Sequence, residues 1–585
     1  MSHNEISTES LRETLTSLRG FAEAEFSSQR NAFIRLWKMP LSARIAEGRC
    51  VAGLRFVRKT TEGQYRFSYQ ENDTDFREGD FLRLSEGDPM DPLSECVLVA
   101  EDPPYITLDI SGKGLDFTLD KDLYLDASYF DLERVVLKGI DEIGTTIRGR
   151  ERLLPLLLGN EVVDDVDEES FEKAWSESDK AGYNNSQSDA IAAGSASQWC
   201  CLVQGPPGTG KTQVLANIVA QRLARGEKIF ITAFTHRAIH QALRTVKKIL
   251  PHEDRIVKIG TYIPDPDLTV PQYEYFADCP LAEMTGGYVI GATVFATRSS
   301  RLRGIDFDVL IVDEASQMTL PYAVLGMLTS DSYVIIGDPQ QLPPVVQSCP
   351  SSQAHEHSIF NSLNRNNDLT LLDTTYRMNS TIADWSSEQF YRGELSSFDS
   401  VASRRLELGC EHEQAWLEKA FNPDHSLVWL EHNESGCRKL CLEEVDLVNQ
   451  LIVCALKNGL TPDDLAVVTP FRKQARAIRQ RVKQSLAVDE TLSNQVIIDT
   501  VERMQGQERE MIIISCASND RGFIRAVSDF LFLPARLNVS VTRARSKVIL
   551  ISSSELLKVD LLTTEAQEAM MVWQNLKASS EVITV

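Results

Sequence analysis

The feature that most constrains this chain is a glycine-rich loop, Gly205-Pro206-Pro207-Gly208-Thr209-Gly210-Lys211-Thr212. It follows the apolar run Cys200–Val203 and opens a segment of helical character, Gln213–Arg225. Glycines allow backbone N–H groups to converge on a β-phosphate, the lysine reaches the β and γ oxygens, and the threonine hydroxyl ligates Mg²⁺. A plain Gly/Pro surface turn is the alternative, but such a turn needs neither the strand before it nor the helix after it. The loop therefore predicts a site for a nucleoside triphosphate and Mg²⁺ in an α/β domain.

The length and composition predict a globular protein of several domains. A chain of 585 residues corresponds to about three or four domains. It has no apolar stretch of about 18 residues and no charged-then-apolar segment in Met1–Ser17. We therefore expect a cytoplasmic protein, or a nuclear one if its source is eukaryotic, with no membrane partner. The 11 cysteines lack a paired C-x2-C framework, and a zinc site at Cys437 and Cys441 would need two further ligands that the sequence does not place nearby.

The net charge is −24, from 60 basic and 84 acidic residues. An acidic chain does not coat nucleic acid through its overall charge, so any polyanion site must be a local groove. Basic stretches at 298–303 and 472–483 are candidates for such a groove, with solvated helix faces as the alternative. The acidic balance also favours recruitment by a protein partner.

The spacing of apolar residues divides the chain into five segments. Leu11, Leu15, Leu18 and Phe21 recur at helical spacing, and the short alternating strands after them would close most simply as a small barrel. The acidic stretch Asp164–Lys180 is expected to be a mostly solvated linker. Buried strands then alternate with helices, which indicates two domains with parallel sheets. The expected segments are an N-terminal helical segment at 1–40, a β-barrel accessory domain at 41–130, a helical and acidic linker at 131–180, a first α/β domain at 181–350 and a second at 351–585.

Two adjacent carboxylates, Asp313 and Glu314, end the apolar strand Phe307–Val312. By itself such a pair is usually a solvated turn, but downstream of a phosphate-binding loop it suits phosphoryl transfer. Asp313 can hold the Mg²⁺ shell, and Glu314 can orient and deprotonate the water that attacks the γ-phosphate. These residues therefore predict hydrolysis of the bound nucleotide.

The order of further motifs resembles that of the superfamily 1 helicases. After the loop come Asp313-Glu314-Ala315-Ser316-Gln317, Gly337–Pro344, Thr375-Tyr376-Arg377-Met378-Asn379, Val467–Phe471, Asp499-Thr500-Val501, Gln505-Gly506-Gln507-Glu508 and Arg536–Arg545. Residues 183–552 look most like the 5′-to-3′ branch, superfamily 1B, which includes the nonsense-mediated-decay helicase and the helicase half of the replication helicase–nuclease. The resemblance implies two tandem RecA-like motor domains, ATP as the nucleotide and single-stranded DNA or RNA as the track.

Carried over position by position, the resemblance implies an ATP site shared by both motor domains. Gln187 would read the adenine edge, and Tyr376 would stack on the base. Gln341 would sense the γ-phosphate, while Arg377 and Arg543 would neutralise the charge that develops on the transferred phosphoryl group. The remaining implied residues are Lys211 on the phosphates, Thr212 and Asp313 on Mg²⁺, Glu314 on the attacking water, and Glu508 near the ribose or γ-phosphate.

For the nucleic-acid track, the resemblance implies residues on loops that follow strands, where hydroxyls and amides reach phosphates. Taken singly, each of them is more simply a helix cap or turn residue, so their assignment depends on the family. They are Thr235, His236, Thr293, Thr469, Pro470, Phe471 and Thr500.

Two departures limit what the resemblance implies. Thr261–Ile290 leaves only about 30 residues for the long helical insertion of the decay helicase, so that element is expected to be absent or reduced. We find neither a four-cysteine cluster pattern nor a nuclease motif upstream of the motor, so nuclease activity is not expected. The expected function is a 5′-to-3′ helicase or translocase on single strands, with DNA slightly favoured over RNA. An ATPase that remodels protein–nucleic acid complexes without unwinding, and a nucleotide-gated clamp or scaffold, stay open as alternatives.

Overall fold

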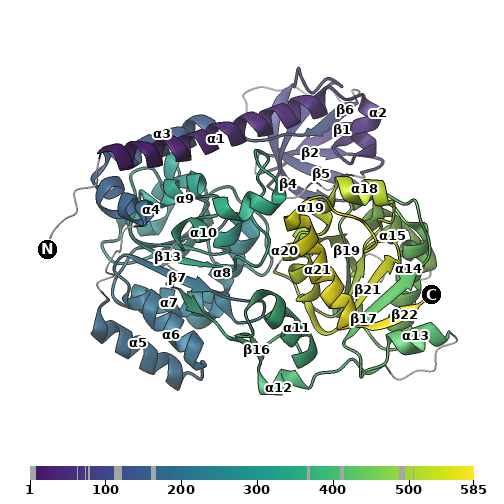
Figure 1. Cartoon of the computed structure of the whole chain (residues 1–585). Coiled ribbons are helices and arrows are strands. Elements are labelled where there is room, and N and C mark those ends of the chain that lie inside the picture. The colour runs from purple at the N-terminus through teal and green to yellow at the C-terminus, as the bar shows by residue number, and fades with distance from the viewer. Residues whose placement is uncertain are drawn as a thin grey trace.

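A long helix, a closed barrel and two parallel sheets follow one another along the chain in the computed structural model (Figure 1). The structure describes residues 8–61, 63–72, 74, 76, 79–110, 122–159, 166–364, 369–408, 414–486, 495–504 and 506–585. Gln505 of one motif and the first two residues of the acidic stretch lie outside the described residues. Within the described part of the chain, no helix has both the length and the apolar character needed to cross a membrane.

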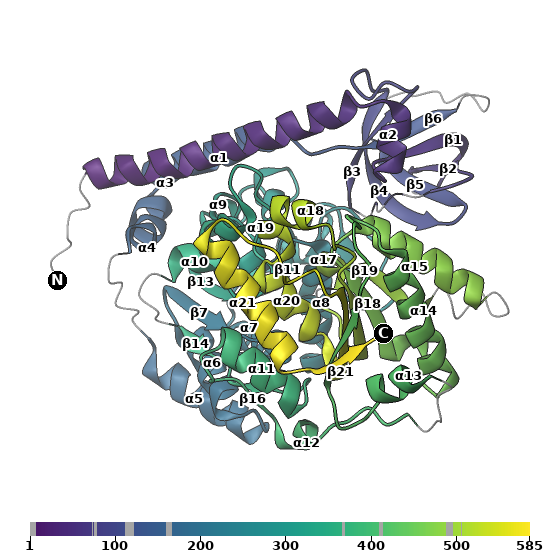
Figure 2. The same cartoon turned by 45° about the vertical axis from the view of Figure 1, so that its right-hand side comes forward.

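The N-terminal helix α1 (Thr8–Trp37) joins the first motor domain to the barrel (Figure 2). Ala22 and Phe26 are buried in the hydrophobic core beneath the first sheet. At the other end, Trp37 Nε1 donates to the carbonyl of Ala127 at 3.0 Å, on the last barrel strand. The N-terminal segment is helical, as the apolar spacing predicted, and it ties two domains together.

The barrel is closed and antiparallel, with strand order β1-β2-β5-β4-β3-β6. Its alternating residues point inward and outward: Leu82 and Leu84 are buried, whereas Phe81 is exposed. A buried ion pair between Arg44 and Asp126 holds the short helix before β1 against β6. The elements are α2 (Leu41–Ala46), β1 (Cys50–Lys59), β2 (Tyr65–Ser68), β3 (Phe81–Ser85), β4 (Ser94–Asp102), β5 (Tyr105–Ile110) and β6 (Leu123–Ala127).

The acidic stretch is a docked helix, which corrects the expectation of a mostly solvated linker. Residues Glu168–Lys180 form α5, which packs along α6 (Asn185–Ala196). Trp175 Nε1 donates to Asp189 Oδ1 at 2.8 Å. Acidic residues occupy the outer face of α5, so the charge of the stretch did not reveal its packed face. The helices before it are α3 (Glu133–Thr145), the π-helical turn η1 (Gly149–Leu153) and α4 (Leu154–Leu158).

The first motor domain is built on an eight-stranded sheet, ordered β10-β9-β11-β8-β12-β13-β7-β14, with every pair parallel. Its last strand, Thr370–Leu371, pairs with β7, so this domain extends past the expected boundary at residue 350. The strands are β7 (Cys200–Gln204), β8 (Ile229–Thr232), β9 (Ile256–Ile259), β10 (Gln272–Tyr273), β11 (Val289–Gly291), β12 (Phe307–Val312), β13 (Ser330–Gly337) and β14 (Thr370–Leu371). The helices are α7 (Lys211–Ala224), α8 (His236–Ile249), α9 (Leu320–Met327) and α10 (Ile359–Leu363).

The second motor domain has a six-stranded parallel sheet, ordered β19-β18-β20-β21-β17-β22. A small two-stranded sheet, β15 (Thr374–Thr375) and β16 (Ser396–Ser397), lies in the segment that joins the two motors. The other strands are β17 (Leu427–His432), β18 (Leu465–Thr469), β19 (Ile497–Thr500), β20 (Arg509–Ser515), β21 (Ala544–Ser553) and β22 (Glu581–Thr584). The helices are α11 (Ser380–Phe390), α12 (Asp399–Ala402), α13 (Ala415–Ala420), α14 (Leu442–Lys457), α15 (Arg472–Ser485), α17 (Val501–Met504), α18 (Arg521–Ala526), α19 (Ser528–Leu531), α20 (Pro534–Val541) and α21 (Thr564–Ala578). Two tandem parallel-sheet domains behind a barrel and N-terminal helices are the predicted fold class.

Candidate ATP site and nucleic-acid cleft

The phosphate-binding loop lies between β7 and α7, where the sequence predicts it. The N–H of Gly205 donates to the carbonyl of Gly337 at 2.9 Å and so fixes the start of the loop to the end of β13. A Cβ on Gly205 would lie 2.1 Å from Lys211 Cγ, so only glycine leaves room for the lysine stem. Lys211 Nζ donates to the Gly205 carbonyl and therefore lies within the loop. The loop is thus shaped around its own lysine.

The segment that joins the two motor domains contacts the tip of this loop. Gly208 has φ +78°, and a Cβ there would lie 2.4 Å from Thr375 Oγ1 and 2.6 Å from Arg377 Cβ. The N–H of Tyr376 donates to the Gly208 carbonyl at 2.8 Å. Since a side chain at residue 208 would push the joining segment away, glycine here keeps Arg377 next to the phosphate-binding loop.

Gln187 and Tyr376 meet beside the loop, although they are 189 residues apart in the sequence. Gln187 is buried and donates through Nε2 to the Thr209 carbonyl at 3.0 Å. The Tyr376 hydroxyl lies 3.5 Å from Gln187 Oε1 and accepts from Asn184 Nδ2 at 3.1 Å. Asn184 also caps α6, because its side-chain oxygen accepts from the Gln187 N–H. An amide edge and an aromatic ring thus stand together, as the resemblance implies for the base pocket.

Asp313 and Glu314 lie at the end of β12, facing the same cleft as Lys211 and Thr212. Asp313 is 4% exposed and accepts from the Glu314 N–H at 2.9 Å. Burial and the neighbouring Glu314 raise the pKa of Asp313 to about 7, while Lys211 acts in the opposite direction. A buried carboxylate of this kind is stabilised by a cation. Asp313 and the Thr212 hydroxyl therefore fit the predicted Mg²⁺ site.

A buried network centred on Asp338 connects the two motor domains. The Asp338 carboxylate accepts from Gln341 Nε2 at 2.8 Å and from the Tyr391 hydroxyl at 2.7 Å. Asn538 Nδ2, on α20 of the second motor, donates to the Tyr391 hydroxyl at 3.0 Å. Arg543 Nη2 donates to Gln341 Oε1 at 3.3 Å. Asp338 and Tyr391 were not predicted, and the only signal for Asp338 was its place beside Gln341 in the Gly337–Pro344 motif.

The two predicted arginines, Arg377 of the joining segment and Arg543 of the second motor, lie at this interface near Glu508. Arg377 Nε donates to one Glu508 oxygen at 2.5 Å, and Arg545 Nη2 donates to the other at 2.6 Å. Burial opposes ionisation of Glu508, but Arg377 and Arg545 lower its pKa to about 2. Burial and Arg377 lower the pKa of Arg543 to about 9, so its guanidinium stays charged near neutral pH. Glu508, expected near the nucleotide, holds two arginines in place.

One cleft of about 2030 Å³ runs from the ATP-site residues to the space between the first motor and the barrel. Of the predicted track residues, Thr235, His236 and Thr293 line it. Thr235 caps α8, since its hydroxyl accepts from the Ala238 N–H at 3.2 Å. The ATP-site residues that line the same cleft include Lys211, Thr212, Asp313, Glu314, Gln341, Arg377, Glu508 and Arg543. The cleft joins candidate ATP chemistry to a candidate nucleic-acid path.

Four predicted track residues do not line this cleft. Thr469 is fully buried, and with Pro470 it lines a small separate pocket of the second motor. The Phe471 ring packs against Phe523 and Phe530, at centroid distances of 5.9 and 5.8 Å. Thr500 is 7% exposed. The role of these four residues in the track stays a prediction: Thr469 and Phe471 are buried at the end of β18, and Thr500 is the last residue of β19.

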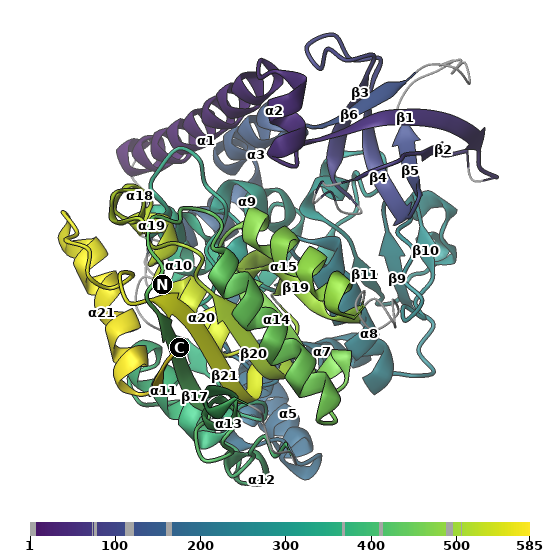
Figure 3. The ribbon, with the colours of Figure 1, turned by 90° about the vertical axis from the view of Figure 1, so that its right-hand side faces the viewer.

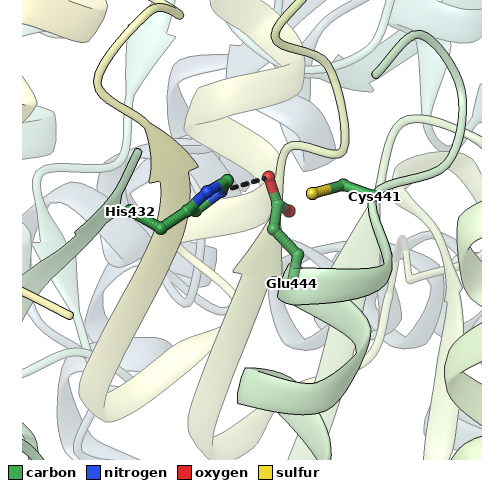
Figure 4. Close-up of side chains that lie close together, drawn as sticks. All are labelled: His432, Cys441 and Glu444. Carbon is green, nitrogen blue, oxygen red and sulfur yellow. Dashed lines mark hydrogen bonds and ion pairs between the residues drawn. The ribbon is translucent and has the colours of Figure 1, made fainter. Parts of the chain in front are cut away.

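A buried cluster supplies the neighbours that the sequence could not place around Cys441. The ligand atoms of His432, Cys441 and Glu444 lie within 4.8 Å of one another, and the side chains point toward each other (Figure 4). His432 Nδ1 accepts a backbone N–H, so Nε2 carries the proton that faces Glu444 Oε1 at 3.4 Å. Glu444 Oε2 also accepts from the Ser515 hydroxyl at 2.6 Å and the Ala517 N–H at 2.8 Å. A metal ion on Nε2 would move the ring proton to Nδ1. Nδ1 already accepts the Glu434 N–H, and two N–H donors cannot face each other there. The arrangement is therefore a hydrogen-bonded core and not a zinc site.

Comparison with known protein families decides the assignment. Two AAA domain families match this chain, one over residues 187–347 and the other over residues 355–555. These two matches cover the motor domains and contain the motifs whose order resembles superfamily 1. The chain belongs to the superfamily 1B helicases. As a superfamily 1B helicase it is an ATP hydrolase by family, as its phosphate-binding loop predicted.

Curated relatives of this superfamily 1B helicase are longer proteins. The chain is 26% identical over 583 residues to the "DNA replication ATP-dependent helicase/nuclease DNA2" of Bos taurus, covering 90% of the chain and 53% of the relative. It is 29% identical over 404 residues to the protein of the same name from Xenopus laevis, covering 63% and 37%. The chain thus spans about half the length of the first relative and a smaller share of the second. Among solved structures, that of Arterivirus nonstructural protein 10 (helicase) is 13% identical and covers 88% of this chain and 80% of that one, with a TM-score of 0.39.

Proposed function

We propose that this chain is an ATP-dependent 5′-to-3′ helicase or translocase on single strands, with DNA slightly favoured over RNA. The observation that carries the proposal is the single cleft shared by the ATP-site residues and by Thr235, His236 and Thr293. A nucleotide and a strand bound in one cleft between two motor domains can each change how tightly the other is held.

Each residue of the ATP site has a role in this proposal. Lys211 contacts the β and γ phosphate oxygens, and Thr212 and Asp313 hold Mg²⁺. When bound, Mg²⁺ neutralises charge on the phosphates. Glu314 orients the attacking water and takes its proton. Arg377 and Arg543, from the joining segment and the second motor, stabilise the charge of the transition state, while Gln341 couples the γ-phosphate to Arg543 through the hydrogen bond between them.

Two other functions use the same site. An ATPase that removes proteins from nucleic acid without unwinding would have the same residues and the same cleft. A nucleotide-gated clamp or scaffold would need no hydrolysis, and the presence of Glu314, Arg377 and Arg543 in the cleft argues against it. We also propose a recruiting protein partner, because the chain carries a net charge of −24. Processive unwinding by the purified chain alone at physiological salt would count against that partner.

The first experiment is steady-state ATP hydrolysis by the purified chain with single-stranded DNA, single-stranded RNA or neither, and with Lys211→Ala as the blank. We expect stimulation, stronger with DNA. A 5′-tailed duplex then separates unwinding from translocation alone. No stimulation by either polymer would favour the clamp.

A second variant tests the chemistry directly. We expect Glu314→Gln to bind ATP with nearly unchanged affinity but to hydrolyse it about 10²–10⁴-fold more slowly, because the general base is lost. Binding is followed with a fluorescent ATP analogue. Glu283→Gln, at an exposed glutamate outside the cleft lining, is the matched control. Normal turnover by Glu314→Gln would refute the role assigned to this carboxylate.

A further inference from the structure

Two phenylalanines of the barrel stack on each other in the cleft. Phe81 lies on β3 and Phe130 follows β6, and their ring centroids are 4.7 Å apart with an angle of 27° between the rings. Both line the cleft, and they are 38% and 53% exposed. The neighbouring Leu82 fills the barrel interior, so Phe81 is not needed for the barrel core. The pair presents an aromatic face to the cleft.

The other aromatic residues near this end of the barrel are packed against one another. Phe33 of α1 stacks on Tyr129 at 5.1 Å, and Trp37 lies 6.2 Å from the same Tyr129 ring. Those rings hold α1 against the barrel. By contrast, among the described residues the ring contact recorded for Phe81 is with Phe130 alone. Exposing two large apolar rings together is unfavourable unless something covers them.

The first-motor side of the cleft carries arginines, some of them paired with acidic residues. The barrel stands beside the strands β9 and β10 of the first motor (Figure 3). It comes close to the start of α8 at Gly79, where a Cβ would lie 3.8 Å from His236 Cδ2. The next residue, Arg237, is exposed and lines the cleft, and within the described part of the chain it has no ion pair or hydrogen bond. Burial is the main cause that lowers the pKa of Arg237; Arg244 and Arg509 act in the same direction, and Asp265 acts in the opposite one. Arg301 lines the same cleft, where its Nη2 lies 3.6 Å from Glu274 Oε1 and donates to Thr261 Oγ1 at 3.1 Å.

We propose that Phe81 and Phe130 form a base-stacking platform for a single-stranded nucleic acid whose phosphates contact the wall of Arg237 and Arg301. This rests on the proposed function and adds a contact on the barrel to it. Aromatic side chains stack on any base, because every base has a π-face, while arginines on the other side of a groove hold the backbone. An arginine without an ion pair in a cleft that also exposes aromatic rings is complementary to a strand and not to an apolar protein segment.

The stacking contribution is separated from the phosphate contribution by two probes of equal length. One is a fluorescent oligo-dT, and the other is an abasic strand with the same sugar–phosphate backbone and no bases. We expect Phe130→Ala to bind oligo-dT about 5- to 50-fold more weakly and the abasic strand with unchanged affinity. Phe130→Leu, which keeps an apolar side chain of similar size without a π-face, is expected to behave like Phe130→Ala.

Arg237→Ala provides the complementary result. It is expected to weaken binding of both probes and to reduce the slope of log affinity against log salt by about one. The matched control for Phe130→Ala is Tyr275→Ala, which removes an exposed aromatic ring of the first motor that does not line the cleft. ATP hydrolysis without nucleic acid is expected to stay at the wild-type rate in Phe130→Ala and Phe130→Leu.

The outcomes distinguish this inference from the proposed function. One outcome is that oligo-dT binds the wild type and stimulates its ATP hydrolysis, but that Phe130→Leu binds each probe as tightly as the wild type does. That outcome overturns the platform and leaves the helicase proposal standing. Equal losses on oligo-dT and on the abasic strand would assign Phe130 a structural role and overturn the platform as well. If the wild type binds neither probe, both proposals fall.

Discussion

Glu314 has a backbone conformation that residues other than glycine rarely adopt. Its φ of 51° and ψ of 42° place it in the left-handed region. Such strain costs about 1 kcal/mol or more and persists mainly where function requires a particular side chain. Its neighbour Asp313 directly follows β12, and Gln317 Nε2 donates to Glu314 Oε2 at 3.2 Å. A carboxylate kept at a position that favours glycine supports the catalytic role proposed for Glu314.

Asp313 makes the Mg²⁺ requirement depend on pH. Its pKa is raised from 3.8 to about 7, so below neutral pH a proton competes with the cation for the carboxylate. We expect the Mg²⁺ concentration that gives half-maximal ATP hydrolysis to rise as the pH is lowered from about 8 to about 6, approaching tenfold per unit at the acidic end. The measurement is a Mg²⁺ titration of hydrolysis at several pH values.

Saturating Mg²⁺ serves as the control for that titration. It should restore the rate at the lower pH, because bound cation lowers the pKa of the carboxylate. An apparent Mg²⁺ affinity that does not change across this range would show that Asp313 does not bind the ion.

At the scale of elements, β17, α14 and the segment after β20 are fastened together by one carboxylate. Glu444, in the first turn of α14, accepts from His432 at the end of β17. It also accepts from Ser515 at the end of β20 and from Ala517 just after that strand. Ala517 has φ +60°, so this segment bends through the left-handed region to bring its N–H to the carboxylate. The three elements therefore depend on Glu444 for their arrangement.

We expect Glu444→Gln to destabilise the second motor domain by about 2–4 kcal/mol, because an amide cannot accept all three donors and its own N–H₂ faces one of them. Hydrogen exchange of β17 and β20 measures the change. Glu443→Gln, in the same turn but exposed, is the control and should shift exchange by no more than a few tenths of a kcal/mol. Equal exchange in the two variants would contradict the role of this cluster.

At the scale of the whole molecule, α1 determines where the barrel stands relative to the first motor. Its middle is fixed by Phe26, which is 3% exposed and lies 6.3 Å from the Tyr322 ring of α9. Glu25 Oε2, on the same helix, accepts from the backbone N–H groups of Gln347 and Ser348, each at 2.9 Å. Because Phe81 and Phe130 line the cleft from the barrel, we expect the docking of α1 to contribute to the shape of the cleft.

Phe26→Ala should loosen this connection. Loss of a buried phenylalanine costs about 3–5 kcal/mol, and the cost falls on the docking of α1. We expect faster hydrogen exchange along α1 and weaker strand binding, with the second motor domain unchanged. Arg12→Ala, on an exposed turn of the same helix, is the control. Unchanged hydrogen exchange in α1 would show that the contacts of α1 other than Phe26 are enough to keep the helix docked.

The sequence by itself determined the α/β class, the barrel strands, the phosphate-binding loop and the adjacent carboxylates. These follow from short contiguous patterns: Gly205 to Thr212 must be a loop before a helix, and Asp313 and Glu314 must end a strand. The long α1 also follows from local apolar spacing. The loop, the carboxylates and the helix need no contact between distant residues. The closure of the barrel does, because it pairs β1 with β6, and only its short alternating strands could be inferred locally.

Only the tertiary structure decided how these pieces meet. The ion pair of Arg377 with Glu508 joins residues 131 positions apart, and the buried Asp338 network, the docking of α5 and the core position of Phe471 depend equally on long-range packing. The first motor domain takes its last strand, β14, from beyond residue 350, because pairing with β7 and not proximity in sequence assigns a strand to a sheet. That the exposed pair Phe81 and Phe130 lines the same cleft as Arg237 also follows only from the folded structure.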